Sequence, residues 1–312
     1  MQTLYAISRM ALLIGLYLLA GTASADRLNR TIATLEKGEA AFGIFSGDRS
    51  MSNARSLARA PIDFVLIDME HGPYDAESLQ RFLLGMTDKS AIANSGSLAM
   101  QTTPIVRLPT NGREMNQYLV KQVLDLGVYG VMFPMINSRE EALNAIASMR
   151  YPKAAGETDA GPQGVRGRAP GNAVWYWGTA YGEYLSKADV WPLDPKGELL
   201  AVIQIETQEA IDQLEEIMTT PGVGAIFVGP SDLSADLGLP RSHPDVEQAI
   251  QTILASCLEH NIPCGITTSP ADIEARTKQG FRFATVGGDA GISRRTAQAL
   301  QLGRKAAGRV ND

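Results

Sequence analysis

The chain has 312 residues, of which 45% are apolar and 20% charged, and its net charge is −6. This is the composition of an ordinary globular protein with enough length to bury a large core. Because no block of Lys or Arg is present, we expect no nucleic-acid partner.

The N-terminal segment differs from the rest of the chain. An apolar run over residues 10–20 follows Arg9 and precedes Ala23-Ser24-Ala25, a small-x-small pattern typical of signal-peptide cleavage. The run is too short to span a membrane comfortably. We interpret residues 1–25 as a secretory signal peptide, which predicts a periplasmic or secreted protein with no stable membrane span after cleavage. An uncleaved anchor and a wrongly chosen start codon, with a cytoplasmic protein, are the alternatives.

Eight short apolar runs follow along the chain, and each leads into a segment with helical periodicity. The runs are continuously apolar rather than alternating, which is typical of parallel strands buried on both faces. They span Phe42–Ser46, Phe64–Met69, Pro104–Leu108, Gly130–Met135, Ala201–Ile205, Ala225–Val228, Cys264–Thr267 and Phe283–Val286.

Helical stripes of apolar residues occupy 114–126, 208–218 and 244–259. Eight strand-and-helix units over about 250 residues predict a (β/α)8 TIM-type barrel. We expect a single barrel domain over residues 26–312. A doubly wound open sheet is the alternative, but no glycine-rich dinucleotide loop follows the first strand.

Residues 151–198 interrupt this rhythm before the fifth strand. The segment holds five prolines and all three tryptophans of the chain. Its aromatic content argues against disorder, and a loop of this length in a compact domain is usually functional. We expect this insert to cover the mouth of the active site, an oligomer interface, or both.

The chain has two cysteines, Cys257 on the apolar face of a helix and Cys264 at the start of a strand. Two buried small side chains are the favoured interpretation, and a disulfide stays open as a possibility. No Cys/His spacing of a zinc site is present.

Polar residues end several of the predicted strands. In barrels of this kind the active site lies at the carboxyl ends of the strands. Each residue alone is compatible with a helix cap or a turn, but together they converge on one barrel mouth. They are Asp68, Glu70 and His71 after the second strand, Arg107 in the third, Gln204 and Glu206 at the fifth, and Ser231 and Asp232 after the sixth.

These residue types favour metal-assisted chemistry next to a carbonyl. Glu206 and Asp232 are hard oxygen ligands suited to Mg²⁺, Mn²⁺ or a similar ion. Such an ion would polarise the keto group of a 2-oxo acid and stabilise an enolate. Arg107 would hold oxyanion charge, and His71 is a base that titrates near neutral pH. Schiff-base chemistry is disfavoured because none of the eight runs ends in lysine.

Four motifs resemble the HpcH/HpaI aldolase (citrate lyase-like) family, and the similarity covers roughly residues 30–305. The motifs are Ile67–Pro73, Val106-Arg107, Gln204–Thr207 and Gly229–Ser234. The resemblance implies a phosphoenolpyruvate/pyruvate-domain-like barrel in a homo-oligomer, for which it suggests a hexamer. It also implies a class II aldolase that uses Mg²⁺, Mn²⁺ or Co²⁺ to cleave a 4-hydroxy-2-oxo acid to pyruvate and an aldehyde.

The resemblance further implies roles for individual residues. His71 would be the general base, and Asp125 would raise its basicity, a role that rests on the resemblance alone. Arg107 would stabilise the transition state. Metal binding would fall to Glu206 and Asp232, and contacts with the pyruvate portion to Gln204, Ser231, Asp232 and Arg107. Glu70, which would order water at the metal, and Asp68 would be supporting residues.

Other functions stay open at this point. The same enolate site would serve an oxaloacetate decarboxylase or another carbon–carbon lyase, although a CoA-thioester lyase would lack its cofactor outside the cytoplasm. An exported, non-catalytic 2-oxo-acid-binding protein is a further alternative, but simple binding needs no base. Arg166 and Arg168 in the insert are either solvated or bind a distal substrate carboxylate. The aldehyde partner is not determined by the sequence.

Overall fold

The apolar runs form parallel strands in the computed structural model, which describes residues 27–154, 156, 160–288 and 292–309. The expected signal peptide, residues 1–25, lies outside the described residues. The strands are β1 (Ala41–Ser46), β2 (Phe64–Asp68), β3 (Thr103–Arg107), β4 (Gly130–Phe133), β5 (Val190–Trp191), β6 (Leu199–Ile205), β7 (Ala225–Val228), β8 (Cys264–Thr267) and β9 (Phe283–Gly288).

Eight of these strands close into a barrel, which confirms the predicted fold class. Neighbours pair in the order β4-β3-β2-β1-β9-β8-β7-β6, and β4 pairs with β6 to close the ring. All pairings are parallel. The two-residue strand β5, which the sequence did not predict, pairs with the start of β6 outside this ring.

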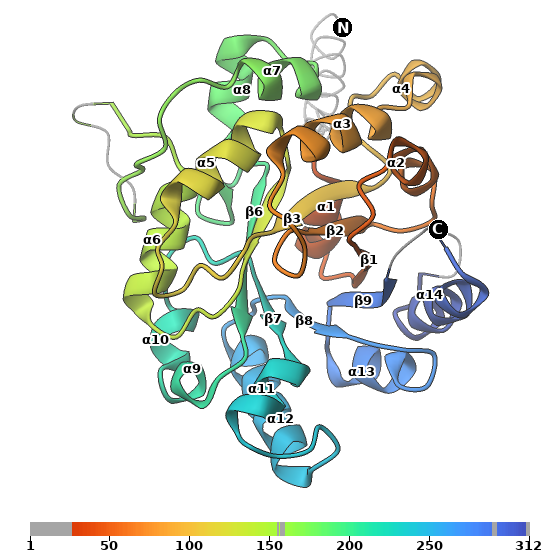
Figure 1. The fold of residues 1–312 in the computed structure, drawn as a ribbon, viewed down its shortest axis with the longest axis vertical. Helices are drawn as coiled ribbons and strands as arrows, with labels where there is room; N and C mark the ends of the chain where they lie inside the picture. Colours follow the sequence, from red (N-terminus) through yellow and green to blue (C-terminus); the bar gives the residue numbers. More distant parts are fainter. Residues whose placement is uncertain (1–26, 155, 157–159, 289–291, 310–312) are drawn as a thin grey trace, which may run out of the picture.

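Helices surround the barrel (Figure 1). They are α1 (Arg30–Glu36), α2 (Met51–Ala58), α3 (Ala76–Met86), α4 (Lys89–Ser95), α5 (Gln117–Leu126), α6 (Arg139–Met149), α7 (Gly171–Trp177), α8 (Tyr181–Lys187), α9 (Gln208–Asp212), α10 (Leu214–Met218), α11 (Pro230–Asp236), α12 (Pro244–Glu259), α13 (Ile273–Gln279) and α14 (Arg294–Ala306). Among the described residues, no helix has the length and apolarity that crossing a bilayer requires.

Two predicted helices differ in detail from the structure. The segment 208–218 forms two short helices, α9 and α10, because Gln213 between them leaves the helical region with φ −109° and ψ 19°. The segment 114–126 becomes helical only at Gln117, since Met115 has a positive φ of 46°. The helix predicted over 244–259 is confirmed.

The insert carries α7, α8 and β5 rather than a continuous loop. Trp177 anchors it, because its ring stacks on Tyr129 with centroids 4.4 Å apart and its indole N–H donates to the Gly127 carbonyl at 2.8 Å. Trp175, by contrast, is 70% exposed. Cys257 and Cys264 are buried with free thiols, as the favoured interpretation expected.

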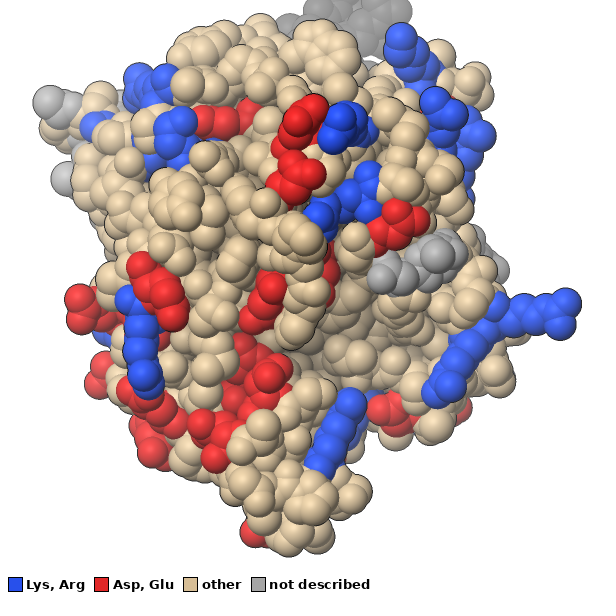
Figure 2. All heavy atoms as spheres, in the orientation of Figure 1, with Lys and Arg blue, Asp and Glu red and all other residues tan. Residues whose placement is uncertain are grey.

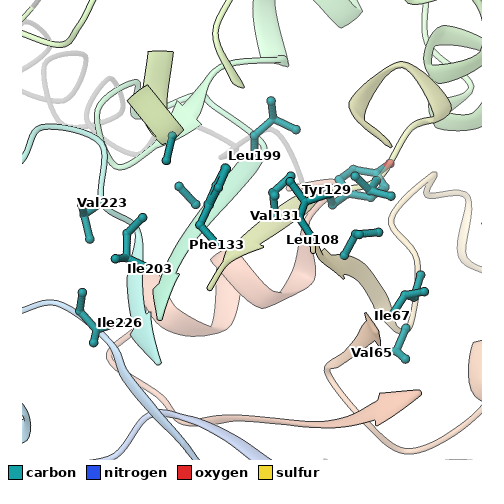
Figure 3. Close-up of a cluster of buried hydrophobic side chains, with 14 of the residues drawn as sticks. Val65, Ile67, Leu108, Tyr129, Val131, Phe133, Leu199, Ile203, Val223 and Ile226 are labelled. Atoms are coloured by element: carbon teal, nitrogen blue, oxygen red, sulfur yellow. The ribbon is translucent and has the colours of Figure 1, made fainter. Parts of the chain in front are cut away.

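The alternation of side chains along the strands divides the core into two layers. Figure 3 shows part of the outer layer, where Val65, Ile67, Val131, Phe133 and Ile203 pack between strands and helices. The inner layer fills the barrel, with Ile32 and Leu35 of α1 contributing to it, and its strand members are Ala41, Phe64, Leu66, Ile105, Met132, Leu200, Val202, Ala225, Phe227 and Phe283. Continuing the same alternation toward the carboxyl ends points Phe45, Asp68, Arg107 and Gln204 into the barrel mouth.

Candidate active site

Asp68 and Arg107 form the centre of the site at the ends of β2 and β3. They are register partners on adjacent strands. Arg107 Nε donates to Asp68 Oδ1 at 3.0 Å, and its Nη2 donates to Oδ2 at 2.6 Å, which gives a two-point ion pair. The Arg107 guanidinium also lies 4.6 Å from the ring centroid of Phe45, a cation–π contact from β1.

The chain turns sharply after β2 and carries Glu70 and His71 into the mouth. Asp68 Oδ1 accepts the main-chain N–H groups of Glu70 and His71 at 3.0 and 3.4 Å. Burial alone would raise the pKa of Asp68, but the Arg107 bonds and charge, with these N–H groups, hold it below its usual range. Asp68 is therefore an ionised support for the turn and for Arg107.

His71 contacts the same arginine. Its Nδ1 lies 2.8 Å from Arg107 Nη2, 3.5 Å from an Asp68 oxygen and 3.6 Å from a Glu70 oxygen. The His71 side chain is 61% exposed, so a substrate entering the mouth can reach it. The structure therefore brings together four residues that the sequence predicted, from two strands and one turn.

Glu206 follows β6 and is almost fully buried. Thr207 caps α9 by accepting the Ala210 N–H, which ends the strand and leaves Glu206 at the bend. One carboxylate oxygen accepts the Met135 N–H at 2.8 Å, and the other accepts the Gln204 side-chain amide. Met135 has a left-handed backbone with φ 57°, a conformation that aims its N–H at the carboxylate.

The carboxylates of Glu70, Glu206 and Asp232 lie close enough for their negative charges to affect one another. Burial first, and then the charges of Asp232 and Glu70, raise the pKa of Glu206 to about 7 against the lowering effect of the bonds from Met135 and Gln204. Burial likewise raises the pKa of Glu70 to about 7, where Arg107 lowers it and Asp68 and Asp232 raise it. Carboxylates that repel one another in a buried pocket are stabilised by a shared cation.

Two further oxygens fit the same conclusion. Glu70 Oε2 is buried without a hydrogen bond, although Arg107 Nη1 lies 3.0 Å away in an ion pair. Gln204 Oε1 is also buried without a partner, because the amide nitrogen is the atom that faces Glu206. Buried acceptor oxygens that lack a hydrogen bond and lie beside carboxylates suit a hard divalent cation.

Asp232 and Ser231 lie in the first turn of α11, after the Gly229 N-cap and Pro230. Both side chains are exposed at the mouth. From Leu199 to Pro240 the chain has seven acidic residues and no Lys or Arg. Figure 2 shows acidic side chains gathered over α9 and α11 beside a central hollow of this face. This charge raises the local concentration of cations.

A second group of possible metal ligands consists of Asp68, Glu70 and His71, whose ligand atoms lie within 4.8 Å of one another. Arg107 occupies both Asp68 oxygens and the His71 Nδ1, so a dication there would lie against a guanidinium. No arginine among the described residues pairs with Glu206 or Asp232, so these two carboxylates stay the predicted ligands.

Asp125 is placed differently from the other predicted residues. It lies on α5 and pairs with Arg166 Nη2 at 2.9 Å and with Lys121. Those are its hydrogen-bonding partners among the described residues, so its role toward His71 stays a prediction. Arg166 is fully buried over the Tyr151 ring, 4.5 Å from its centroid, so the solvated role is wrong for this residue. Its role in binding a distal carboxylate stays a prediction.

Two contributors to the site were not predicted from the sequence. Phe45 was hidden in an apolar run, although the alternation of β1 places it on the inner face. Met135 acts through its main-chain N–H, which leaves no residue-type signal. The volume of a cavity does not identify this site, because a cavity of about 930 Å³ lies elsewhere on the protein. Its lining residues include Arg30 and Arg304.

Comparisons with known proteins agree with this geometry. The sequence model of the HpcH/HpaI aldolase/citrate lyase family matches residues 41–295. Proteins named 5-keto-4-deoxy-D-glucarate aldolase from Salmonella paratyphi A and Salmonella newport are 34% identical over 276 residues, which is 87% of this chain and 95% of theirs.

Solved structures show the same fold. A HpcH/HpaI aldolase/citrate lyase family protein from Burkholderia cenocepacia is 30% identical with a TM-score of 0.70, covering 91% of this chain and 100% of that one. A HpcH/HpaI aldolase from Desulfitobacterium hafniense superimposes with a TM-score of 0.66 at 23% identity, over 86% of this chain and 91% of its own.

Proposed function

Because this chain belongs to the HpcH/HpaI aldolase/citrate lyase family and is a carbon–carbon lyase, we propose that it cleaves a 4-hydroxy-2-oxo acid to pyruvate and an aldehyde with a divalent metal ion. The observation that carries the proposal is the facing arrangement of two groups. Arg107 and His71 lie on one side of the mouth, and the carboxylates of Glu70, Glu206 and Asp232 repel one another beside them.

Glu206 and Asp232 would hold the ion, which is Mg²⁺, Mn²⁺ or Co²⁺. When bound, the ion supplies Lewis-acid polarisation of the substrate keto oxygen. Glu206 is held by Met135 and Gln204, so its orientation is fixed before the ion arrives. Gln204, Ser231 and Asp232 would contact the pyruvate portion of the substrate.

The protein side chains account for the proton movements. His71 removes the proton from the 4-hydroxyl group, and the O–H electron pair becomes the carbonyl of the departing aldehyde as the C3–C4 bond breaks. The C3–C4 bond pair forms the C2–C3 double bond and the keto C=O pair moves onto the oxygen, where the Arg107 guanidinium stabilises the negative charge. The protonated His71 then returns its proton to C3, which restores the keto group and completes pyruvate. His71 acts through Nδ1 only after Arg107 turns from it to the substrate.

The substrate class follows from the relatives. Proteins named 5-keto-4-deoxy-D-glucarate aldolase share 34% identity with this chain. We propose a deoxy keto sugar acid of this kind, in which the aldehyde fragment also carries a carboxylate. The relatives support aldol cleavage, so decarboxylation or binding without turnover is not needed to account for the site.

The experiment is a coupled pyruvate assay on the purified protein. Lactate dehydrogenase and NADH report pyruvate released from 5-keto-4-deoxy-D-glucarate in the presence of Mn²⁺ or Mg²⁺. EDTA should abolish the signal and added metal restore it. Glu206→Gln should lose both activity and Mn²⁺ binding, and His71→Ala should lose activity but keep Mn²⁺ binding. Activity that survives EDTA contradicts the metal, and full activity in His71→Ala contradicts the base.

We propose that the protein is a homo-oligomer, a hexamer on the family resemblance. Exposed aromatic side chains on adjoining helices support this, with Tyr118 of α5 62% exposed, Trp175 of α7 70% and Tyr181 of α8 52%. Light scattering on the eluting protein tests it, and Trp175→Glu should reduce the mass measured.

We also propose export to the periplasm or medium, on the basis of the N-terminal apolar run and Ala23-Ser24-Ala25. N-terminal sequencing of the protein from its producing cells should begin at Asp26. An intact Met1 contradicts cleavage.

A further inference from the structure

Arg49, in the loop between β1 and α2, is bonded to the loop that follows β2. Its Nε donates to the Ser78 hydroxyl on α3 at 2.9 Å. Its Nη1 donates to the main-chain carbonyl of Asp68 at 3.2 Å, and its Nη2 donates to that of Pro73 at 2.9 Å. One guanidinium therefore joins the start of this loop, its end and the next helix.

The two bonded carbonyls bracket Glu70 and His71. The His71 side chain is 61% exposed, and a Cβ added at Gly72 would meet nothing within 4 Å. The N–H groups of Glu70 and His71 donate to the Asp68 carboxylate. Met69 is buried in the core, but residues 71–73 are exposed, so the conformation of this outer part of the loop depends mainly on hydrogen bonds.

The turn that carries Arg49 is itself ordered. The buried Asn53 side chain donates to the Ser46 hydroxyl at 2.9 Å and to the Asp48 carbonyl at 2.8 Å. The Asp48 carboxylate accepts the Ser50 N–H at 2.8 Å, and the Ser50 hydroxyl caps α2. The backbone on either side of Arg49 is thus held before the guanidinium bonds form.

We infer that Arg49 is a positioning residue that holds the loop over residues 69–73 and keeps His71 beside Arg107 and Glu70. The inference rests on the proposed function, in which His71 is the base. Within the described part of the chain, the Arg49 side chain bonds to the two ends of this loop and to Ser78, whereas Glu206 and Asp232 come from the end of β6 and from α11. Its loss should therefore reduce turnover and leave metal binding intact.

The first test compares steady-state kinetics and Mn²⁺ titrations of variants. Arg49→Ala should lower kcat by about 10- to 100-fold, because small misplacements of a reacting group cost that much. KM and the Mn²⁺ Kd should stay within about twofold of the wild-type values, because the substitution changes no contact of Glu206 or Asp232. Arg49→Lys should give partial recovery, because an ammonium lacks the planar fork. Ser78→Ala should have the smallest effect, and Arg59→Ala, an exposed arginine paired with Asp88, is the matched control.

The second test needs no activity. The chain has three histidines, so the ring C–H signals of His71, His243 and His260 can be followed by NMR in the full-length protein. Arg49→Ala should shift or broaden the His71 signal and leave the other two unchanged. If wild type releases no pyruvate, the proposed function fails while this spectrum still decides the role of Arg49.

A wild-type kcat together with an unchanged His71 signal in Arg49→Ala overturns the inference. A parallel loss of Mn²⁺ affinity also overturns it, since that indicates a general structural role. If Arg49→Ala fails to fold, the same measurements on Arg49→Lys and Ser78→Ala decide the question. A wild-type kcat and a wild-type His71 signal in both variants overturn the inference.

Discussion

The Nη2 atom of Arg107 lies 2.8 Å from Nδ1 of His71. A guanidinium has donors only, so a hydrogen bond in this contact requires Nδ1 to accept and the ring proton to lie on Nε2. The lone pair that a base would use is therefore occupied until Arg107 turns to another acceptor. The contact couples the proposed base, His71, to Arg107, which stabilises the oxyanion. When substrate oxygens bind the Arg107 guanidinium, Nδ1 of His71 becomes free to accept a proton.

We first expect His71 in the free protein to carry its ring proton on Nε2. Nitrogen NMR at pH 8 should report an unprotonated Nδ1 and a protonated Nε2 for His71 in the free protein. His243, whose Nδ1 accepts the Asp245 N–H at 3.2 Å, is an internal reference for the same tautomer. Adding Mg²⁺ and pyruvate should change the His71 Nδ1 shift only. A protonated Nδ1 in the free protein contradicts the assignment.

Arg107→Lys should reduce kcat/KM by about 10²- to 10³-fold, the usual cost of losing an oxyanion donor. A lysine cannot bond both Asp68 oxygens and stack on Phe45 at once, so the turn after β2 also loses support. The pyruvate-release assay measures this. Arg113→Lys changes an exposed arginine paired with Glu209 and should stay near wild type; equal losses in both variants count against a special role for Arg107.

Gly229→Ala tests the position of Glu206. A Cβ at Gly229 would come within 2.3 Å of Glu206 Oε2 and 3.0 Å of the Gln204 nitrogen, so the buried carboxylate must move. We expect the Mn²⁺ affinity measured by calorimetry to fall about 10- to 100-fold, as for other changes that misorient ligands. Gly182→Ala, which would meet nothing within 4 Å, is the control. Unaltered Mn²⁺ binding in Gly229→Ala removes Glu206 from the ligand set.

The buried pair of Arg150 and Asp189 should make stability depend on pH. Burial would raise the pKa of Asp189, but the bonds and charge of Arg150, with the Val190 N–H and Lys153, hold it below its ordinary value of 3.8. A depressed pKa stabilises the folded state above the unfolded value, and this contribution is lost as the pH falls through the folded value.

Asp189→Asn should therefore lower the free energy of unfolding by about 3–5 kcal/mol at neutral pH, because Arg150 loses its buried counter-charge. Urea denaturation should show the difference from wild type constant above about pH 5 and shrinking below about pH 4. Glu77→Gln, which breaks the exposed pair with Arg81, should change stability by less than about 1 kcal/mol. A deficit that persists undiminished at pH 3 argues against the ion pair as its source.

The sequence by itself determined the strands and the residues at their carboxyl ends. Eight apolar runs became eight barrel strands because segments buried on both faces leave a continuous signal. Asp68, Arg107 and Gln204 also follow the two-residue alternation that faces them inward, so their convergence could be anticipated. The split at Gln213 could not, because apolar periodicity continues across it.

Only the tertiary structure decided how these groups are held. Besides the local Lys121, Asp125 pairs with Arg166 from the insert, 41 residues away, and no local pattern encodes that second pairing. The Met135 N–H and the Arg49 guanidinium act across loops whose conformations depend on neighbouring elements. Strand ends are fixed by local burial and alternation, whereas ligand orientation comes from long-range hydrogen bonds that exist only once the barrel has closed.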